Sequence, residues 1–184
     1  MAADVLIRDA VEADADAISV IGKKAMPAQY AGLVDPVATE AAVEQSYAPS
    51  AVAECITRCH EATDALFLVA ERGRLIGFLH FDSFGPESEL HRLYVDDSER
   101  GGGVGALLMD ALHARIGKDS VYMLLVAEGN EGAVRFYERS GLHVEALVDG
   151  LSYYAERMGI RFPAGIQPFR LVLMRRPAQE AAYP

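Results

Sequence analysis

The sequence predicts an α/β fold, in which helices pack on a mixed β-sheet. Two apolar segments, 66–70 and 74–81, are separated by a short turn and are expected to pair as an antiparallel hairpin. An alternating strand at 90–95 is followed by glycines and an amphipathic run at 104–112. A buried strand is expected at 121–126, with a further helical run after it. Hairpin-linked strands followed by a strand–helix–strand–helix–strand order are typical of this fold class.

The segments before the hairpin are expected to form one strand and two helical runs. Residues 5–8 predict the first strand, and an amphipathic helix follows it. Pro27 is expected to interrupt that helix, which makes 29–36 a loop. The run over 37–60 is expected to be helical and to be broken at Pro49.

Length and composition indicate a single domain over residues 1–176, with 177–184 as a disordered tail. The chain has 184 residues and is 51% hydrophobic, which is enough for a full core. No apolar run reaches the roughly eighteen residues that a membrane span needs. The first residues are acidic, without the basic-then-apolar order of a signal peptide. A cytoplasmic protein with no membrane partner is therefore expected.

The formal net charge of the chain is −10. Nucleic acid is an unfavourable partner for such a chain, because its phosphates require a basic face. An acidic balance is compatible with an amine substrate, which is a cation in water. No nucleic-acid partner is therefore expected.

The two cysteines, Cys55 and Cys59, lie four residues apart on a predicted helix, beside His60. This spacing is that of half a metal site, and the sequence holds no second pair to complete it. Buried thiols or a helix surface explain the pattern better. No metal is therefore expected.

The segment from Arg100 to Ala106 is the most informative stretch of the chain. It reads Arg-Gly-Gly-Gly-Val-Gly-Ala and lies between the strand at 90–95 and the helix that follows. Free N–H groups at the start of a helix attract an anion, and glycine lets a phosphate approach the backbone closely. Successive glycines can also form an N–H concavity that needs no side chain. The segment therefore predicts a backbone cradle for a pyrophosphate.

The same glycines also satisfy the fingerprint of a dinucleotide-binding fold. Gly101, Gly103 and Ala106 fit the pattern Gly-x-Gly-x-x-Gly/Ala, and Glu128 follows at the distance of a ribose-binding acid. Against this hypothesis, five residues separate the strand from the glycines, and about 90 residues precede the unit. Too few residues follow for a second nucleotide-binding half. An NAD(P)-binding fold is therefore the less favoured alternative, as is a merely structural helix start.

The segment after the strand at 121–126 distinguishes these alternatives. It reads Glu-Gly-Asn-Glu-Gly-Ala-Val-Arg-Phe-Tyr-Glu-Arg-Ser-Gly-Leu over 128–142. Together with the glycine segment it closely resembles the GNAT superfamily of acyl-CoA-dependent N-acyltransferases, over roughly residues 4–148. The pyrophosphate loop of that family, Gln/Arg-x-x-Gly-x-Gly/Ala, is matched by Arg100, Gly103 and Gly105. The second signature, Asn-x-x-Ala-x-x-Phe/Leu-Tyr-x-x-x-Gly-Phe, is matched by Asn130, Ala133, Phe136, Tyr137 and Gly141, with Leu142 in place of the last Phe.

The resemblance implies a GNAT-like fold, a central and mostly antiparallel sheet with one parallel, splayed strand pair and flanking helices. It also implies acetyl-CoA as co-substrate. Strands are implied near 142–148 and at 169–174. The long connection at 151–163 is expected to be a substrate lid, a dimer contact or an ordered surface loop. The acetyl-CoA-binding residues are expected to be Leu93, Tyr94, Val95, Arg100, Gly101, Gly102, Gly103, Val104, Gly105, Ala106, Asn130, Ala133 and Tyr137.

Acetyl transfer to an amine needs a neutral nucleophile, a polarised carbonyl and a proton for the leaving thiolate. By resemblance, Tyr137 is the acid toward the thiolate, with a core tyrosine as the alternative reading. A backbone N–H near the end of the strand at 93–95 is expected to polarise the thioester carbonyl. Asn130 is expected to contact the pantetheine arm or to cap its own helix.

The general base is assigned to Glu89, because similar proteins often place a glutamate on this strand, acting directly or through water. On an alternating strand, Glu89 and His91 share one face, and Leu90 and Arg92 share the other. The alternatives are His80, Tyr30, Tyr153 and a water chain.

The sequence thus predicts an N-acetyltransferase that moves the acetyl group of acetyl-CoA to a primary amine by direct transfer in a ternary complex. The acceptor is an unidentified small molecule or peptide. The alternative from another class is an acyl-CoA-binding regulatory or structural module without turnover. A homodimer is expected as well, because apolar and aromatic residues are frequent in 151–174.

Overall fold

The computed structural model describes residues 4–84, 87–117, 119–157 and 159–177. Within them, seven strands form one sheet in the order β1-β2-β3-β4-β5-β7-β6. The strands are β1 (Leu6–Asp9), β2 (Leu66–Glu71), β3 (Leu75–Phe84), β4 (Glu87–Val95), β5 (Tyr122–Ala127), β6 (His143–Asp149) and β7 (Arg170–Arg176). The helices are α1 (Ala15–Tyr30), α2 (Pro36–Ser46), α3 (Pro49–Glu61), α4 (Val104–Ile116), α5 (Glu131–Arg139) and α6 (Gly150–Arg157), with short 3-10 turns η1 (Glu12–Asp14) and η2 (Asp97–Glu99).

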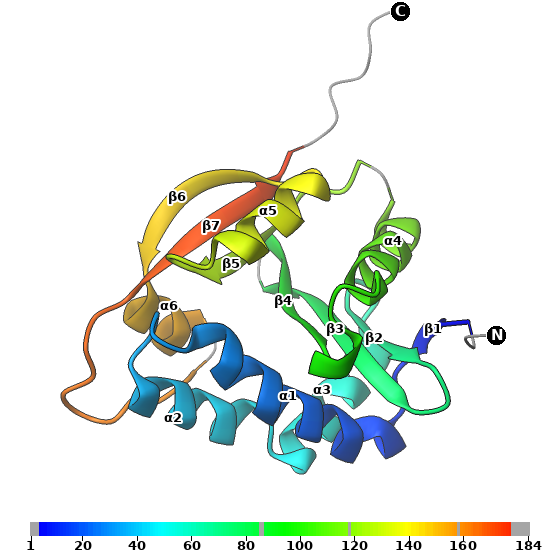
Figure 1. Ribbon diagram of the computed structural model, residues 1–184, viewed down its shortest axis with the longest axis horizontal. Helices are drawn as coiled ribbons and strands as arrows, with labels where there is room; N and C mark the ends of the chain where they lie inside the picture. Colours follow the sequence, from blue (N-terminus) through cyan, green and yellow to red (C-terminus); the bar gives the residue numbers. More distant parts are fainter. Residues whose placement is uncertain (1–3, 85–86, 118, 158, 178–184) are drawn as a thin grey trace, which may run out of the picture.

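Helices cover both faces of the sheet, with α1, α2 and α3 on one side and α4 and α5 on the other (Figure 1). The alternation of side chains along β3 explains the two layers. Phe78 packs into the cluster with α1–α3, whereas Leu79 and Phe81 pack into the cluster with α4 and α5. In the part of the chain that the structure describes, no helix combines the length and apolar character that crossing a bilayer requires.

Every strand pair of the sheet is antiparallel except β4 with β5, which run parallel. These two strands pair at a single position, Glu89 opposite Met123. Beyond that position they diverge, which opens the sheet between them (Figure 1). The predicted mixed sheet with one splayed parallel pair is therefore confirmed.

A β-bulge interrupts β4 at His91. Arg92 pairs with His80 on β3, and Leu90 pairs with Phe81, so His91 is the extra residue. The prediction that Leu90 and Arg92 share a face is wrong for this reason. Leu90 packs on the α4 side of the sheet, whereas the Arg92 guanidinium lies over the ring of Tyr47 on the α1–α3 side.

The first helix is longer than predicted. Helix α1 continues through Pro27 to Tyr30, so the interruption at Pro27 and the loop over 29–36 were both wrong in part. Proline removes one backbone donor, but Ala25 and Met26 are buried and Tyr30 packs against the same core, which holds the last turn in place. The predicted break at Pro49 is confirmed, since α3 begins there.

The connection after β6 is not simply a surface loop, because its first part forms helix α6. Three of its aromatic rings, Tyr154, Phe162 and Phe169, pack against one another with centroids 6.2–6.5 Å apart. They extend the core instead of presenting an apolar surface, so the reason for expecting a dimer contact in this segment was wrong. The single domain over 1–176 stays a prediction, and of the predicted tail all but Pro177 lies outside the described residues.

Candidate active site

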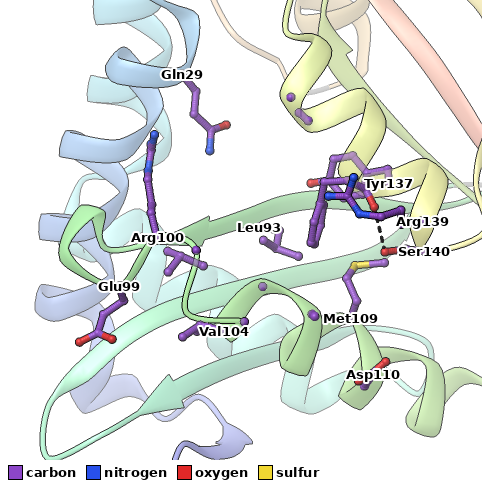
Figure 2. A pocket seen from close by; sticks show the side chains of 18 of the residues that line it. Gln29, Leu93, Glu99, Arg100, Val104, Met109, Asp110, Tyr137, Arg139 and Ser140 are labelled. Atoms are coloured by element: carbon purple, nitrogen blue, oxygen red, sulfur yellow. Dashed lines mark hydrogen bonds between the residues drawn. The ribbon is translucent and has the colours of Figure 1, made fainter.

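A cleft of about 810 Å³ lies where β4 and β5 diverge, between the glycine turn, α4 and α5. Figure 2 shows Leu93 of β4 in the cleft, with Val104 and Met109 of α4 on one side and Tyr137 of α5 on the other. Gln29, from the last turn of α1, reaches toward the same space (Figure 2). Three separate parts of the chain therefore converge on one cavity.

Most of the residues predicted to bind acetyl-CoA line this cleft. Gly102 does not line it, and the buried Tyr94 side chain points to the α1–α3 face, where it lines a smaller cavity that adjoins the cleft. The predicted residues that line the cleft are Leu93, Val95, Arg100, Gly101, Gly103, Val104, Gly105, Ala106, Asn130, Ala133 and Tyr137.

The glycine turn is built from backbone conformations that favour glycine. Gly101 and Gly103 have φ angles of +77° and +81°, and Gly103 is the residue before α4. The first helical hydrogen bond runs from the Leu107 N–H to the Gly103 carbonyl at 3.1 Å. The N–H groups of residues 104–106 therefore have no intrahelical acceptor at the edge of the cleft. Such a helix start is suited to a phosphate.

Gly105 has a different role from Gly103. A Cβ atom at Gly105 would lie 3.3 Å from Cζ of Phe136 and 3.6 Å from Cδ2 of Leu93. Around Gly103 there is no atom within 4 Å of such a position. Gly105 therefore allows α4 to approach α5 and β4 closely, whereas a side chain at Gly103 would project into open space.

The Arg100 side chain is held next to the turn. Its Nε forms an ion pair with Oδ1 of Asp97 at 2.8 Å, and about half of the side chain is exposed. Arg100 therefore places a positive charge at the edge of the cleft, while the backbone supplies the donors at its centre.

Two backbone N–H groups of β4 face the gap between β4 and β5. The Asp96 N–H bonds to the Ile76 carbonyl at the β3 side of the strand. Successive N–H groups of a strand point to opposite sides, so those of Leu93 and Val95 point away from β3. Because β5 has diverged there, these donors are available to a ligand carbonyl.

Tyr137 lies on the inward face of α5. Oδ1 of Asn130 accepts a hydrogen bond from the Ala133 N–H at 3.1 Å, which caps the helix and fixes its start. The Tyr137 side chain is half-buried and lines both the cleft and the smaller cavity. Its hydroxyl bonds to no described residue, and burial raises the pKa of Tyr137, so the group stays protonated. It is available as a proton donor.

Glu89 and His91 form a buried pair on β4. Nδ1 of His91 lies 3.3 Å from Oε1 of Glu89, and the Tyr153 hydroxyl donates to the other carboxylate oxygen. His91 lines the smaller cavity together with Tyr137, whereas Glu89 does not, and both side chains are buried, with exposed fractions of 1% for His91 and 5% for Glu89. Of the pair, His91 is therefore the residue that borders the small cavity beside Tyr137, although its ring is itself buried.

The environment fixes the charges of this pair. Burial opposes ionisation of Glu89, but the hydrogen bonds and charges of His91, Tyr153 and Arg157 outweigh it, and the pKa of Glu89 is lowered. The pKa of His91 is also lowered, because its burial outweighs the attraction of Glu89. At neutral pH, His91 is therefore a neutral imidazole that can accept a proton, with an ionised carboxylate beside it.

The other candidate bases are placed less well. The Tyr30 hydroxyl lies 3.3 Å from that of Tyr154, and burial raises the pKa of Tyr30. Burial and the nearby Glu89 also raise the pKa of Tyr153. His80 is 2% exposed and stacks on Phe67, away from the cleft.

Cys55 and Cys59 are buried free thiols, as predicted. His60 is not their partner, because its Nε2 lies 2.9 Å from the Ala10 carbonyl oxygen. His80 of β3 takes that place, and its ring and the two sulfur atoms offer three ligand atoms within 4.8 Å of one another. However, the Arg58 guanidinium lies 3.6 Å from the Cys55 sulfur, which makes the place unfavourable for a cation.

Sequence reasoning missed several residues of this region. Gln29 was assigned to a loop, and His91 was only named as a neighbour of Glu89. The run of small and apolar residues before Pro27 was the one signal that the helix continues. Arg92 and Arg157 gave no signal at all, because their place depends on the bulge in β4 and on α6.

Comparisons with known proteins agree with this fold. A family model described as the acetyltransferase (GNAT) family matches residues 35–142. The fold is similar to a PaiA N-acetyltransferase from Thermoplasma acidophilum solved with coenzyme A, with a TM-score of 0.73, 22% identity and coverage of 95% of this chain and 99% of that one. It is also similar to a GNAT-superfamily phosphinothricin acetyltransferase from Sinorhizobium meliloti in complex with AcCoA, with a TM-score of 0.69, 19% identity and coverage of 99% and 91%.

A ribosomal-protein-alanine N-acetyltransferase from Brucella melitensis gives a TM-score of 0.62 at 24% identity, with coverage of 94% of this chain and 99% of that one. A comparison with curated protein sequences finds no match.

Proposed function

Because the chain belongs to the GNAT family of acetyltransferases, we propose that it transfers the acetyl group of acetyl-CoA to a primary amine by direct attack within a ternary complex. One observation carries the proposal. The glycine turn, the free N–H groups of β4 and the Tyr137 hydroxyl all open onto one cleft. A module that only binds acyl-CoA needs the glycine turn but no proton donor. A proton donor in the same cleft is useful only if the thioester is cleaved.

The donors that line the cleft support the binding of acetyl-CoA there. We assign the diphosphate to the N–H groups at the start of α4, and the acyl carbonyl to the Leu93 or Val95 N–H. Bound there, the thioester supplies an activated acetyl group with a thiolate as the leaving group. Asn130 and Ala133 line the cleft on the way to Tyr137.

The protein side chains then move two protons. His91 accepts the proton of the attacking amine through a water, because its ring is buried, while Glu89 holds the ring through Nδ1. Tyr137 donates its hydroxyl proton to the departing thiolate. In this proposal Glu89 is a positioning residue, which modifies the prediction that it is the base itself.

Gly103→Val is expected to weaken the binding of acetyl-CoA by roughly tenfold or more, because a branched side chain strains the turn and blocks its N–H groups. Calorimetric titration measures the effect. Gly73→Val is the matched control, since Gly73 has a similar φ of +70° in the β2–β3 hairpin, with no atom near its side-chain position. Unchanged affinity in a folded Gly103→Val protein would contradict the assignment of the cradle.

The proposed function is tested by mixing the protein with acetyl-CoA and a panel of amines and following the free thiol. The expected result is thiol release that depends on a particular amine and on the protein concentration. Tight binding of acetyl-CoA without thiol release, for every amine tested, would favour the binding module instead.

We propose that the chain forms a homodimer through β6, which lies at the edge of the sheet. Val144 and Leu147 on this strand are 52% and 48% exposed, an unusual pattern for a strand. Light scattering is expected to give twice the mass of one 19.9 kDa chain at micromolar concentration. Replacing Val144 and Leu147 together by lysine is expected to give the single-chain mass. A monomer in the wild type would remove the idea.

A further inference from the structure

A second cavity, of about 370 Å³, lies between α2, α3, α6 and the sheet. Three arginines reach it, Arg58 from α3, Arg92 from β4 and Arg157 from the end of α6. We refer to it as the arginine cavity. Guanidinium groups stay charged in proteins, so three of them around one small space need anions to balance them.

The protein itself supplies only part of that balance. Arg58 donates to Asp82 at 2.9 Å. Nη1 of Arg157 lies 3.5 Å from Oε2 of Glu87, and its Nη2 lies 3.7 Å from Oε2 of Glu89. Both distances are too long for a good hydrogen bond. Arg92 forms no ion pair with any carboxylate of the described residues. The charge of Arg92 is therefore not balanced by a carboxylate of the described residues, and that of Arg157 is balanced only in part.

Buried donors point to the same conclusion. Nη1 of Arg92, and Nε and Nη2 of Arg157, are shielded from solvent and have no hydrogen-bond acceptor among the described residues. A buried donor without an acceptor is costly, and most such groups find one. A ligand with two acceptor oxygens would satisfy two of these donors at once.

The arginine cavity adjoins the proposed base. Arg92 directly follows the bulged His91, and the rings of His80 and His91 are 5.1 Å apart. The Arg157 guanidinium lies beside the carboxylate of Glu89, which holds His91. These contacts place the arginine cavity on one side of the Glu89–His91 pair and the space that His91 and Tyr137 share on the other.

We infer that the acceptor is an amino-acid-like compound, a primary amine that also carries a carboxylate, and that Arg92 and Arg157 bind the carboxylate while the amine reaches His91. This inference rests on the proposed function. The planar fork of arginine matches a carboxylate. Because such a compound is a zwitterion, the net charge of −10 does not repel it as it would repel a simple anion.

Cys55 lies in the wall of the same cavity. The pKa of Cys55 is lowered, because the Cys59 thiol donates to it and because His80 and Arg92 favour the thiolate. This shift agrees with a positive potential in the cavity. It also makes a Cys55 thiolate an internal anion that could replace the ligand, so the experiment needs a variant without the thiol.

The experiment measures thiol release from acetyl-CoA with three acceptors of the same skeleton, alanine, alaninamide and 1-aminoethylphosphonate. It is repeated with longer amines that carry a carboxylate, an amide or a phosphonate. The expected kcat/KM, calculated on the concentration of neutral amine, is about 10- to 100-fold higher for the carboxylate than for the amide of the same skeleton. Arg92→Gln is expected to remove this preference by lowering the value for the carboxylate alone. Arg115→Gln, a change on the exposed surface of α4, and Cys55→Ala are expected to retain it.

The outcomes separate the inference from the proposed function. Equal kcat/KM for carboxylate and amide overturns the inference and leaves acetyl transfer standing, whereas no thiol release with any amine overturns the proposed function. A preference for the phosphonate overturns the choice of a carboxylate. A preference that survives in Arg92→Gln but is lost in Cys55→Ala overturns the role of Arg92. The wild-type comparison decides the main point even if Arg92→Gln fails to fold.

Discussion

Tyr137→Phe is expected to lower turnover with acetyl-CoA by about 10²–10³-fold, the scale of losing one positioned acid. The substitution keeps the ring, which packs beside Phe136, and removes only the hydroxyl proton. The hydroxyl bonds to no described residue, so neither folding nor the affinity for acetyl-CoA should change measurably. Steady-state thiol release and calorimetric titration measure the two quantities separately.

A second acyl donor provides the control for Tyr137. A thioester whose leaving thiol is more acidic needs less help from an acid, so the loss caused by Tyr137→Phe should shrink with it. If turnover with acetyl-CoA is unchanged while chemistry limits the rate, Tyr137 is a packing residue.

His91→Gln is expected to lower kcat/KM at neutral pH by about 10²–10³-fold, because the amine then loses its proton acceptor. The pKa of His91 is lowered by burial, so the base is neutral at pH 7 and activity falls only as the pH drops below about 6.5. The acceptor amine also ionises and contributes to the pH profile of kcat/KM. This contribution is the same for every variant, so comparison with the wild type removes it.

Glu89→Gln distinguishes a positioning residue from a base. The carboxylate of Glu89 stabilises the imidazolium of His91, so its removal should lower the pKa of His91 further. The acid limb of the pH profile should therefore move to lower pH while the plateau of kcat/KM falls. If Glu89→Gln abolishes the acid limb and His91→Gln retains it, Glu89 is the base.

The order of the elements and the glycine turn could be predicted from the sequence because both are local properties. The hairpin of β2 and β3, the turn before α4 and the signature around Tyr137 each depend on a short run of residues. The glycine turn needs particular backbone angles, which only certain residues tolerate, so the sequence reveals it directly.

The residues around the proposed acceptor site could not be predicted, because tertiary contacts determine their positions. The bulge at His91 depends on how β4 pairs with β3, and it moves Arg92 to the opposite face from the one that alternation predicts. The continuation of α1 past Pro27 depends on the burial of its last turn. Arg157 reaches the arginine cavity only because α6 forms.

Mass spectrometry after a single turnover with acetyl-labelled acetyl-CoA tests the proposed direct transfer. The label is predicted to appear on the amine nitrogen of the acceptor, in the same amount as the free thiol, with none on the protein, including on Cys55. Label retained on a protein side chain, or thiol released without an acetylated acceptor, would contradict direct transfer from acetyl-CoA to the amine.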